Sequence, residues 1–489
     1  MGSLGILFKN TSSMMFASYF GMGVNFIFTI ILARHFGAEG LGIFMTAMTF
    51  AFFGSIITDF GIKNVFVRNV SRNKSDLPLY FVNGLFVALS TALVSWIGIA
   101  IVVYFLGYNA YLTTIILVST STLCFSALSS VCISTITALE RMELISIDSI
   151  ICVIVYSLIG VLIVVLGYSI LILVVWGLIV EILNGIALFL VIKRIKRIGF
   201  SWNVKPSFCL SILKQSAPIG ILRALNVLTN KVDILMLSAM VGNSPVGFYG
   251  VAVRIVNFLL VPSGSLNNAI LPHFSVRLSS SKDDVKRIYD EIVRVLILLS
   301  FPIAIIIATS AESVVILLFG QSFVDHGSAE ALKILIWSFF FDTISGPAAI
   351  LIISLEHRLM SLVCFAGALT LLNVVVNIFM IPAFGIIGAS ISTLICSLIR
   401  FILLIVIVYK VMSEKMKIFG FLLKPSICAV LNYAIIFTCK DYNMVISIFA
   451  GLVVYVTSLF MLKALTNEDL SFMKKLVLIG AGKGLKLKV

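Results

Sequence analysis

Apolar runs long enough to cross a lipid bilayer recur along nearly the whole 489-residue chain. About 20 apolar residues span the hydrocarbon core as a helix, and a helix in lipid satisfies its own backbone hydrogen bonds, so no sheet is needed. The runs lie at residues 12–33, 41–62, 79–106, 112–139, 144–167, 170–192, 212–240, 247–272, 291–319, 329–354, 360–381, 385–409, 425–440 and 444–464. The sequence therefore predicts an all-α polytopic membrane protein with about fourteen transmembrane helices.

Charge and composition agree with this class. The chain is 61% hydrophobic and 11% charged, with a net charge of +14. The Lys and Arg residues gather in alternate loops, at 63–74, 193–197, 277–287 and 410–424, and in the tail at 474–488. Such loops face the cytoplasm and contact anionic membrane lipid. We therefore expect a multi-pass protein of the cytoplasmic membrane with both termini cytoplasmic, and no nucleic-acid partner.

The sequence supports neither a metal site nor a cofactor. The eight cysteines form no Cys-x-x-Cys pair, and the four histidines show no His-x-x-x-His spacing. Most of the cysteines lie in apolar runs, where a free thiol packs as a small hydrophobic group.

The first two apolar runs end in recognisable motifs. The first ends in Ala-Arg-His-Phe-Gly at 33–37, and the second ends in Asp-Phe-Gly at 59–61, followed by Arg68. This hairpin resembles the polysaccharide flippases of the multidrug/oligosaccharidyl-lipid/polysaccharide exporter (MOP) superfamily. The resemblance implies two six-helix lobes around a V-shaped cavity, alternating access, and often two extra helices at the C-terminus.

An internal repeat points to the same architecture. A gapless shift of 205 residues places Asn25 on Asn230, Gly37 on Gly242 and Gly42 on Gly247. A second, shorter match pairs 139–142 with 355–358. Both matches join segments of the same predicted orientation, so the halves are parallel repeats. We predict two pseudo-symmetric six-helix lobes at 1–205 (helices 1–6) and 206–410 (helices 7–12), with helices 13–14 and a basic cytoplasmic tail at 411–489.

Polar residues at helical spacing mark the expected substrate path between the lobes. A charge that faces lipid at mid-depth costs about 2.5–3.5 kcal/mol, so these residues are expected to face a hydrated interior. The substrate-binding candidates are Asn25 and Arg34 in the first run, Arg223, Asn226, Asn230, Lys231 and Asp233 in the seventh, Arg254 and Asn257 in the eighth, and Arg400 in the twelfth.

Several of these residues have an alternative role. Arg223 and Lys231 could pair with Asp233 and only lock helices together. Arg34 and Arg400 lie near helix ends and could extend to the membrane interface. Asp59 is expected to brace the turn that follows it. Glu181, isolated in the sixth run, is a candidate proton or cation site.

The excess of arginine over acid in these stripes favours an anionic substrate, because arginine binds phosphate oxygens in a bidentate manner. Together with the resemblance, this predicts a transporter, a flippase for a polyprenyl-pyrophosphate-linked oligosaccharide such as an O-antigen or capsule repeat unit. A coupling ion remains open. The alternative is a cation-coupled multidrug antiporter of the same superfamily. A membrane-embedded glycosyltransferase is disfavoured, because no loop exceeds about 20 residues, far below the size of a catalytic domain.

Overall fold

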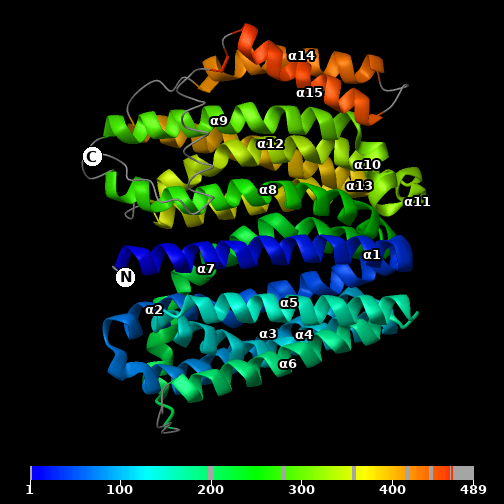
Figure 1. The fold of residues 1–489 in the computed structure, drawn as a ribbon. Coiled ribbons are helices and arrows are strands. Elements are labelled where there is room, and N and C mark those ends of the chain that lie inside the picture. Colours follow the sequence, from blue (N-terminus) through cyan, green and yellow to red (C-terminus); the bar gives the residue numbers. More distant parts are fainter. Residues whose placement is uncertain are drawn as a thin grey trace. The chain divides into compact units, whose positions relative to one another are not determined.

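The computed structural model describes residues 3–195, 203–277, 282–354, 359–412, 418–439, 444–462 and 464–465. All the regular elements in these ranges are helices (Figure 1). In this part of the chain, eleven helices are long and apolar enough to span a membrane. The chain is thus an all-α polytopic membrane protein, as the sequence predicts.

Two of the eleven helices each consist of two helices joined at a sharp break. A straight helix of 57 residues, such as α1 (Ser3–Asp59), would measure about 85 Å, nearly three times the hydrocarbon core of a bilayer. Instead α1 breaks at Gly37, with φ 67°, and turns back on itself (Figure 1). The 54-residue α13 (Leu359–Met412) breaks in the same manner at Gly385, with φ 56°. With these halves counted separately, and with the 18-residue α15 (Met444–Met461), each of the fourteen predicted spans contains a helix in the described residues. The span at 291–319 is interrupted at Ser310.

Most of the remaining elements coincide with predicted runs, whereas α2 (Ile62–Arg72), α11 (Gln321–Asp325) and a short 3₁₀ turn, Lys74–Asp76, lie between runs and were not predicted. The others are α3 (Leu77–Leu106), α4 (Ala110–Ala138), α5 (Met142–Val165), α6 (Ile170–Ile195), α7 (Pro206–Met240), α8 (Asn243–Arg277), α9 (Lys282–Thr309), α10 (Ala311–Phe319), α12 (Ser328–Ile353) and α14 (Ile418–Cys439).

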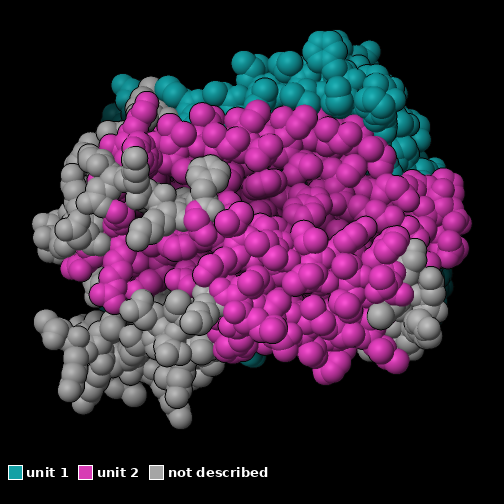
Figure 2. All heavy atoms as spheres, turned by 90° about the horizontal axis from the view of Figure 1, so that it is seen from above, with its two compact units in different colours: residues 1–250, 362–386 teal, residues 251–361, 387–489 magenta. Residues whose placement is uncertain are grey.

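The chain divides into two compact units, coloured separately in Figure 2. Unit 1 comprises residues 1–250 and 362–386, and unit 2 comprises residues 251–361 and 387–489. The predicted lobe boundaries at 205 and 410 stay predictions, and residues 355–358 of the shorter repeat match lie outside the described part.

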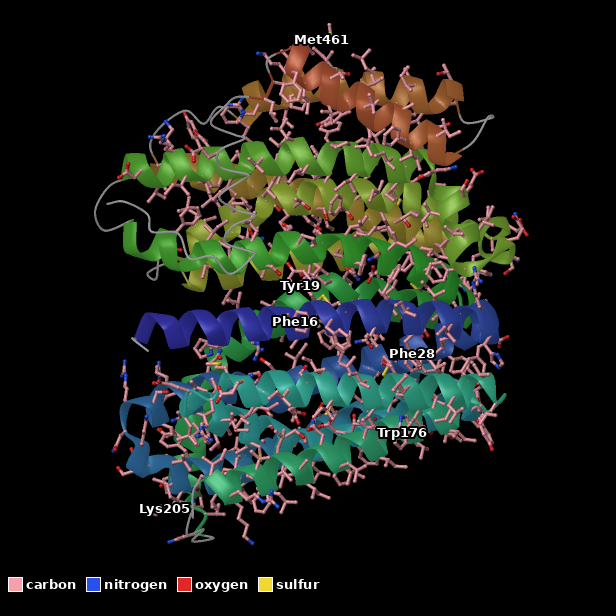
Figure 3. The ribbon with its side chains drawn as sticks, viewed as in Figure 1. Phe16, Tyr19, Phe28, Trp176, Lys205 and Met461 are labelled. Carbon is pink, nitrogen blue, oxygen red and sulfur yellow. The ribbon has the colours of Figure 1, made fainter. Side chains whose placement is uncertain are left out.

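Inside unit 1, small residues let the helices approach closely. Phe28 of α1 packs edge-on against Tyr156 of α5, with ring centroids 5.5 Å apart (Figure 3). Gly160 lies next to the Phe28 ring, because a Cβ atom added to Gly160 would come within 2.9 Å of that ring. Helix association in lipid depends on such packing, because there is no hydrophobic driving force between the helices.

The outward surfaces of the helices are apolar. Phe105 of α3 is 81% exposed, and Met461 of α15, labelled in Figure 3, is 84% exposed. Large apolar side chains at this exposure suit contact with lipid rather than water.

Two glycines related by the 205-residue shift contact each other's hairpin within unit 1. A Cβ atom on Gly42 would overlap the carbonyl oxygen of Asn243, and one on Gly247 would overlap that of Ala38. The shift maps Ala38 onto Asn243 and Gly42 onto Gly247, so the contact is reciprocal. A two-fold relation between two copies of one hairpin produces this pattern. The superposition of the complete halves stays a prediction.

Unit 2 has its own packed interior. The Tyr455 hydroxyl donates to the Leu298 carbonyl at 3.0 Å, which ties α15 to α9. Leu459 and Cys428 belong to the same buried cluster. A charged pair crosses from α12 to the second half of α13, where Arg400 Nη1 lies 3.5 Å from Asp342 Oδ1.

Candidate functional site

A cavity of about 530 Å³ lies within unit 1, between α1, α2, α3, α4, α6 and α7. Eleven of its nineteen described lining residues are polar. The polar residues that line it are Ser55, Thr58, Asp59, Lys63, Ser126, Ser129, Ser130, Ser134, Glu181, Asn184 and Arg223.

The corner between α1 and α2 brings the charged groups of this cavity together. Phe60 and Gly61 have positive φ values of 32° and 80°, which end α1 and turn the chain into α2. A Cβ atom on Gly61 would lie 2.9 Å from the Ser216 carbonyl oxygen of α7. Only glycine tolerates both the backbone conformation and this close approach. The corner therefore packs directly on α7 and places Asp59 beside Arg223.

Asp59 has two partners at this corner. Its Oδ1 accepts a hydrogen bond from the Lys63 backbone N–H at 3.2 Å, which supports the start of α2. Its Oδ2 accepts from Nη1 of Arg223 in an ion pair. The Arg223 side chain remains 51% exposed, against 20% for Asp59. Asp59 thus braces the turn, as predicted, while half of the Arg223 surface stays accessible.

Another part of the cavity lining is formed by α4 and α6. The Ser126 hydroxyl donates to the Leu123 carbonyl at 3.0 Å, and the Ser134 hydroxyl donates to the Ser130 carbonyl at 2.7 Å. The Ser129 hydroxyl donates to Glu181 Oε1 at 2.8 Å, across from α4 to α6. We call these three serines, with Ser130, Glu181 and Asn184, the α4–α6 wall.

A second cavity, of about 380 Å³, lies between α5 and α6. Apart from Asp148 and Asn184, its lining residues are apolar. Asn184 lines both cavities, whereas Glu181 lines only the first and Asp148 only the second.

Of the residues that the sequence predicted in unit 1, Arg223 lines the polar cavity. Asn25 instead donates from Nδ2 to the Gly21 carbonyl of its own helix at 2.9 Å. Asp233 is buried and accepts hydrogen bonds from the Tyr249 hydroxyl and the Ile234 backbone N–H. The alternative predicted from the sequence paired Arg223 with Asp233. In the structure Arg223 pairs instead with Asp59, which lies 164 residues away in the sequence.

The other predicted residues lie outside the lining of this cavity. Arg34 and Asn230 are exposed, Lys231 is half-buried, and the side chain of Asn226 lies outside the described part. In unit 2, Asn257 is exposed, and the Nε of Arg254 is buried without a hydrogen-bond partner among the described residues. Their meeting with Arg223 in one central cavity stays a prediction.

Lys63 and the serines of α4 line the cavity but were not among the site residues predicted from the sequence. Ser126, Ser130 and Ser134 repeat at intervals of four residues, which places them on one helix face. That spacing was a usable signal. Glu181 was noted as an isolated acid, but its hydrogen bond to Ser129 depends on the packing of α4 against α6.

Comparison with known proteins gives matches of two kinds. The family model described as polysaccharide biosynthesis protein matches residues 7–277, more than half of the chain, and the MatE model matches residues 218–379. No curated protein in the comparison matches the chain.

Among solved structures, the lipid II flippase MurJ in an inward closed conformation has a TM-score of 0.74 at 16% identity, over 93% of this chain and 98% of that one. An inward-facing multidrug resistance MATE family transporter of the MOP superfamily has a TM-score of 0.60 at 14% identity, over 80% and 96%. A MOP superfamily transporter from Pyrococcus furiosus has a TM-score of 0.57 at 12% identity, over 85% and 99%. At such identities these likenesses establish a shared fold.

Proposed function

Since the chain belongs to the polysaccharide biosynthesis protein family and is a membrane transporter of the MOP superfamily, we propose that it flips a polyprenyl-pyrophosphate-linked oligosaccharide across the cytoplasmic membrane. The substrate is a repeat unit of a cell-surface glycan. Transport proceeds by alternating access, and both termini lie in the cytoplasm, as the basic loops favour.

The observation that carries this proposal is the mixed chemistry of the polar cavity. Its lining includes both the cations Lys63 and Arg223 and the hydroxyl, amide and carboxylate groups of the α4–α6 wall. Arginine and lysine bind phosphate oxygens, and hydroxyl, amide and carboxylate groups bind sugar hydroxyls. A pyrophosphate joined to a sugar requires both chemistries next to each other.

A hydrated cavity inside the membrane also addresses the physical obstacle to flipping. A polar group moved into hydrocarbon without a hydrogen-bond partner loses roughly 2–7 kcal/mol. An oligosaccharide head carries many such groups, so its unassisted crossing is very slow. The cavity supplies partners for the head, while the polyprenyl tail stays in the surrounding lipid.

The proposal is tested with purified protein in proteoliposomes that contain a fluorescent polyprenyl-pyrophosphate-linked oligosaccharide. A membrane-impermeant quencher reaches only the outer leaflet in protein-free vesicles. With a flippase present, fluorescence from the inner leaflet should be quenched as well. Quenching that stays at the protein-free level would refute the proposal.

The match to the MatE model over residues 218–379 favours one alternative, a cation-coupled multidrug antiporter. A parallel set of vesicles with a cationic dye and an imposed Na⁺ or proton gradient separates the two functions. Gradient-driven dye movement without glycan flipping would establish the antiporter instead.

A further inference from the structure

We propose that the α4–α6 wall is a sugar subsite that selects sugars without carboxylate groups, such as neutral hexoses and N-acetylhexosamines, over acidic sugars such as uronic acids. This inference rests on the proposed function and specifies the class of glycan that the same cavity accepts.

Three of the four serine hydroxyls of this wall already donate their protons within the protein. A serine hydroxyl carries one proton and two lone pairs. Ser126 and Ser134 donate their protons to carbonyl groups of their own helix, and Ser129 donates its proton to Glu181. Towards a ligand, these hydroxyls therefore present oxygen lone pairs. The wall accepts hydrogen bonds from a ligand more readily than it donates them.

The acid and the amide add to this acceptor character. Within the described residues, Glu181 accepts a hydrogen bond from Ser129 and makes no ion pair. The Asn184 Oδ1 atom is buried and has no hydrogen-bond partner in the same part of the structure. The Glu181 carboxyl group, which lines the cavity, matches the O–H and N–H donors of neutral and N-acetylated sugars.

The charge of the wall opposes acidic sugars. Asp148 lies close enough to Glu181 for the two carboxylates to interact electrostatically, with Asn184 lining the cavities on both sides. A carboxylate on the sugar can only accept hydrogen bonds, so it would meet an acceptor surface of like charge.

The cations of the cavity come from other helices than α4 and α6. Lys63 and Arg223 belong to the α1–α2 corner and to α7, and Arg223 already has Asp59 as a partner. These two cations fit the pyrophosphate and set the orientation of the head, with the sugar directed towards α4 and α6. A volume of about 530 Å³ lies in the range of small-ligand pockets.

The test measures binding of three probes to the full-length protein in lipid nanodiscs. All three share one short polyprenyl pyrophosphate. The first carries a neutral N-acetylhexosamine disaccharide, the second carries the same disaccharide with its outer sugar as a uronic acid, and the third carries no sugar. For the native protein we expect the neutral probe to bind about tenfold more tightly than the acidic probe.

Two variants of the wall should move this ratio in opposite directions. Glu181→Gln removes the charge and retains the shape, and should bring the two affinities to within about threefold. Ser130→Asp adds a second carboxylate to the wall and should widen the ratio. The matched control is Glu143→Gln, the same chemical change in the first turn of α5, outside the cavity lining, and it should leave the ratio unchanged.

Equal affinities in the native protein would overturn the inference. So would a Glu181→Gln variant that weakens both sugar probes equally, because that outcome assigns Glu181 a structural or ion-coupling role. If the sugar-bearing probes bind with no discrimination while flipping persists, only this inference fails. If none of the three probes binds, the sugar-free pyrophosphate included, the proposed function fails with it.

Discussion

Removal of the Arg223 guanidinium should weaken pyrophosphate binding far more than it weakens the fold. The Arg223 side chain is 51% exposed, and its partner Asp59 is 20% exposed. An ion pair that water reaches in this way contributes only about 0.2–1 kcal/mol to stability. A hydrogen bond from a charged group to phosphate contributes about 1.5–3 kcal/mol. At about 1.4 kcal/mol for each factor of ten, Arg223→Ala should raise the Kd for the substrate by about 10- to 150-fold.

The variant Asp59→Asn separates a binding role from a structural one. Asparagine keeps an oxygen that can accept from the Lys63 N–H, but it removes the carboxylate charge that competes with phosphate for Arg223. We therefore expect Asp59→Asn to leave substrate affinity unchanged or to increase it, whereas Arg223→Ala lowers it. Arg223→Lys should lie between the native protein and the alanine variant, because lysine keeps the charge but loses the bidentate geometry.

The assay is competition binding of sugar-free polyprenyl pyrophosphate in nanodiscs, with thermal unfolding of each variant measured in parallel. Arg287→Ala is the control, since Arg287 is an exposed arginine paired with Glu291 on α9. The reasoning is refuted if Asp59→Asn and Arg223→Ala weaken binding to the same extent. It is also refuted if both variants lower the unfolding temperature and neither changes affinity, because the pair would then be a structural brace alone.

Three further predictions concern packing. Gly247→Ala and Gly42→Ala should each lower stability by about 1–3 kcal/mol through overpacking, because the added Cβ would meet the facing hairpin. The control Gly23→Ala should be tolerated, because the space around its Cβ position is open. Equal unfolding temperatures for all three variants would show that the hairpin contact is absent. Gly61→Ala should cost about 1–2 kcal/mol of stability because of its φ of 80°. It should also reduce glycan flipping, measured in proteoliposomes, because it displaces the corner that carries Lys63. In unit 2, Asp342→Asn and Arg400→Met should each lower the unfolding temperature, because removing one partner leaves the other charge without its ion pair. The double variant should recover part of this loss. A double variant with an unfolding temperature no higher than that of the worse single variant would contradict this expectation.

The membrane-spanning architecture could be predicted from sequence because it depends on local properties. The length and composition of each apolar run define a helix that satisfies its own backbone, so the fourteen runs needed no knowledge of their neighbours. The glycines at 37 and 242 marked the hairpin turns for a similar local reason. The shift of 205 residues paired Gly42 with Gly247, but the sequence held no sign that the paired hairpins touch each other.

The site was predicted less well, because it depends on which helix faces meet. The stripe on α7 identified Arg223 as a lining residue, yet Asp233 of the same stripe is buried against Tyr249. Ten residues of helix extend about 15 Å along the axis, so the two residues meet different neighbours. The partner of Arg223 comes from the α1–α2 corner, and helix spacing within α7 cannot indicate it.

The central claim, that the polar cavity of unit 1 holds the glycan head, is tested most directly by photo-crosslinking with the unmodified protein. The probe is a polyprenyl-pyrophosphate-linked oligosaccharide with a diazirine on its sugar, and the labelled peptides are identified by mass spectrometry. The account predicts covalent labels on α4 around 126–134 and on α6 around 181–184, competed by unlabelled substrate. Labels confined to α9, α12 and α14 of unit 2, with α4 and α6 unmodified, would contradict it.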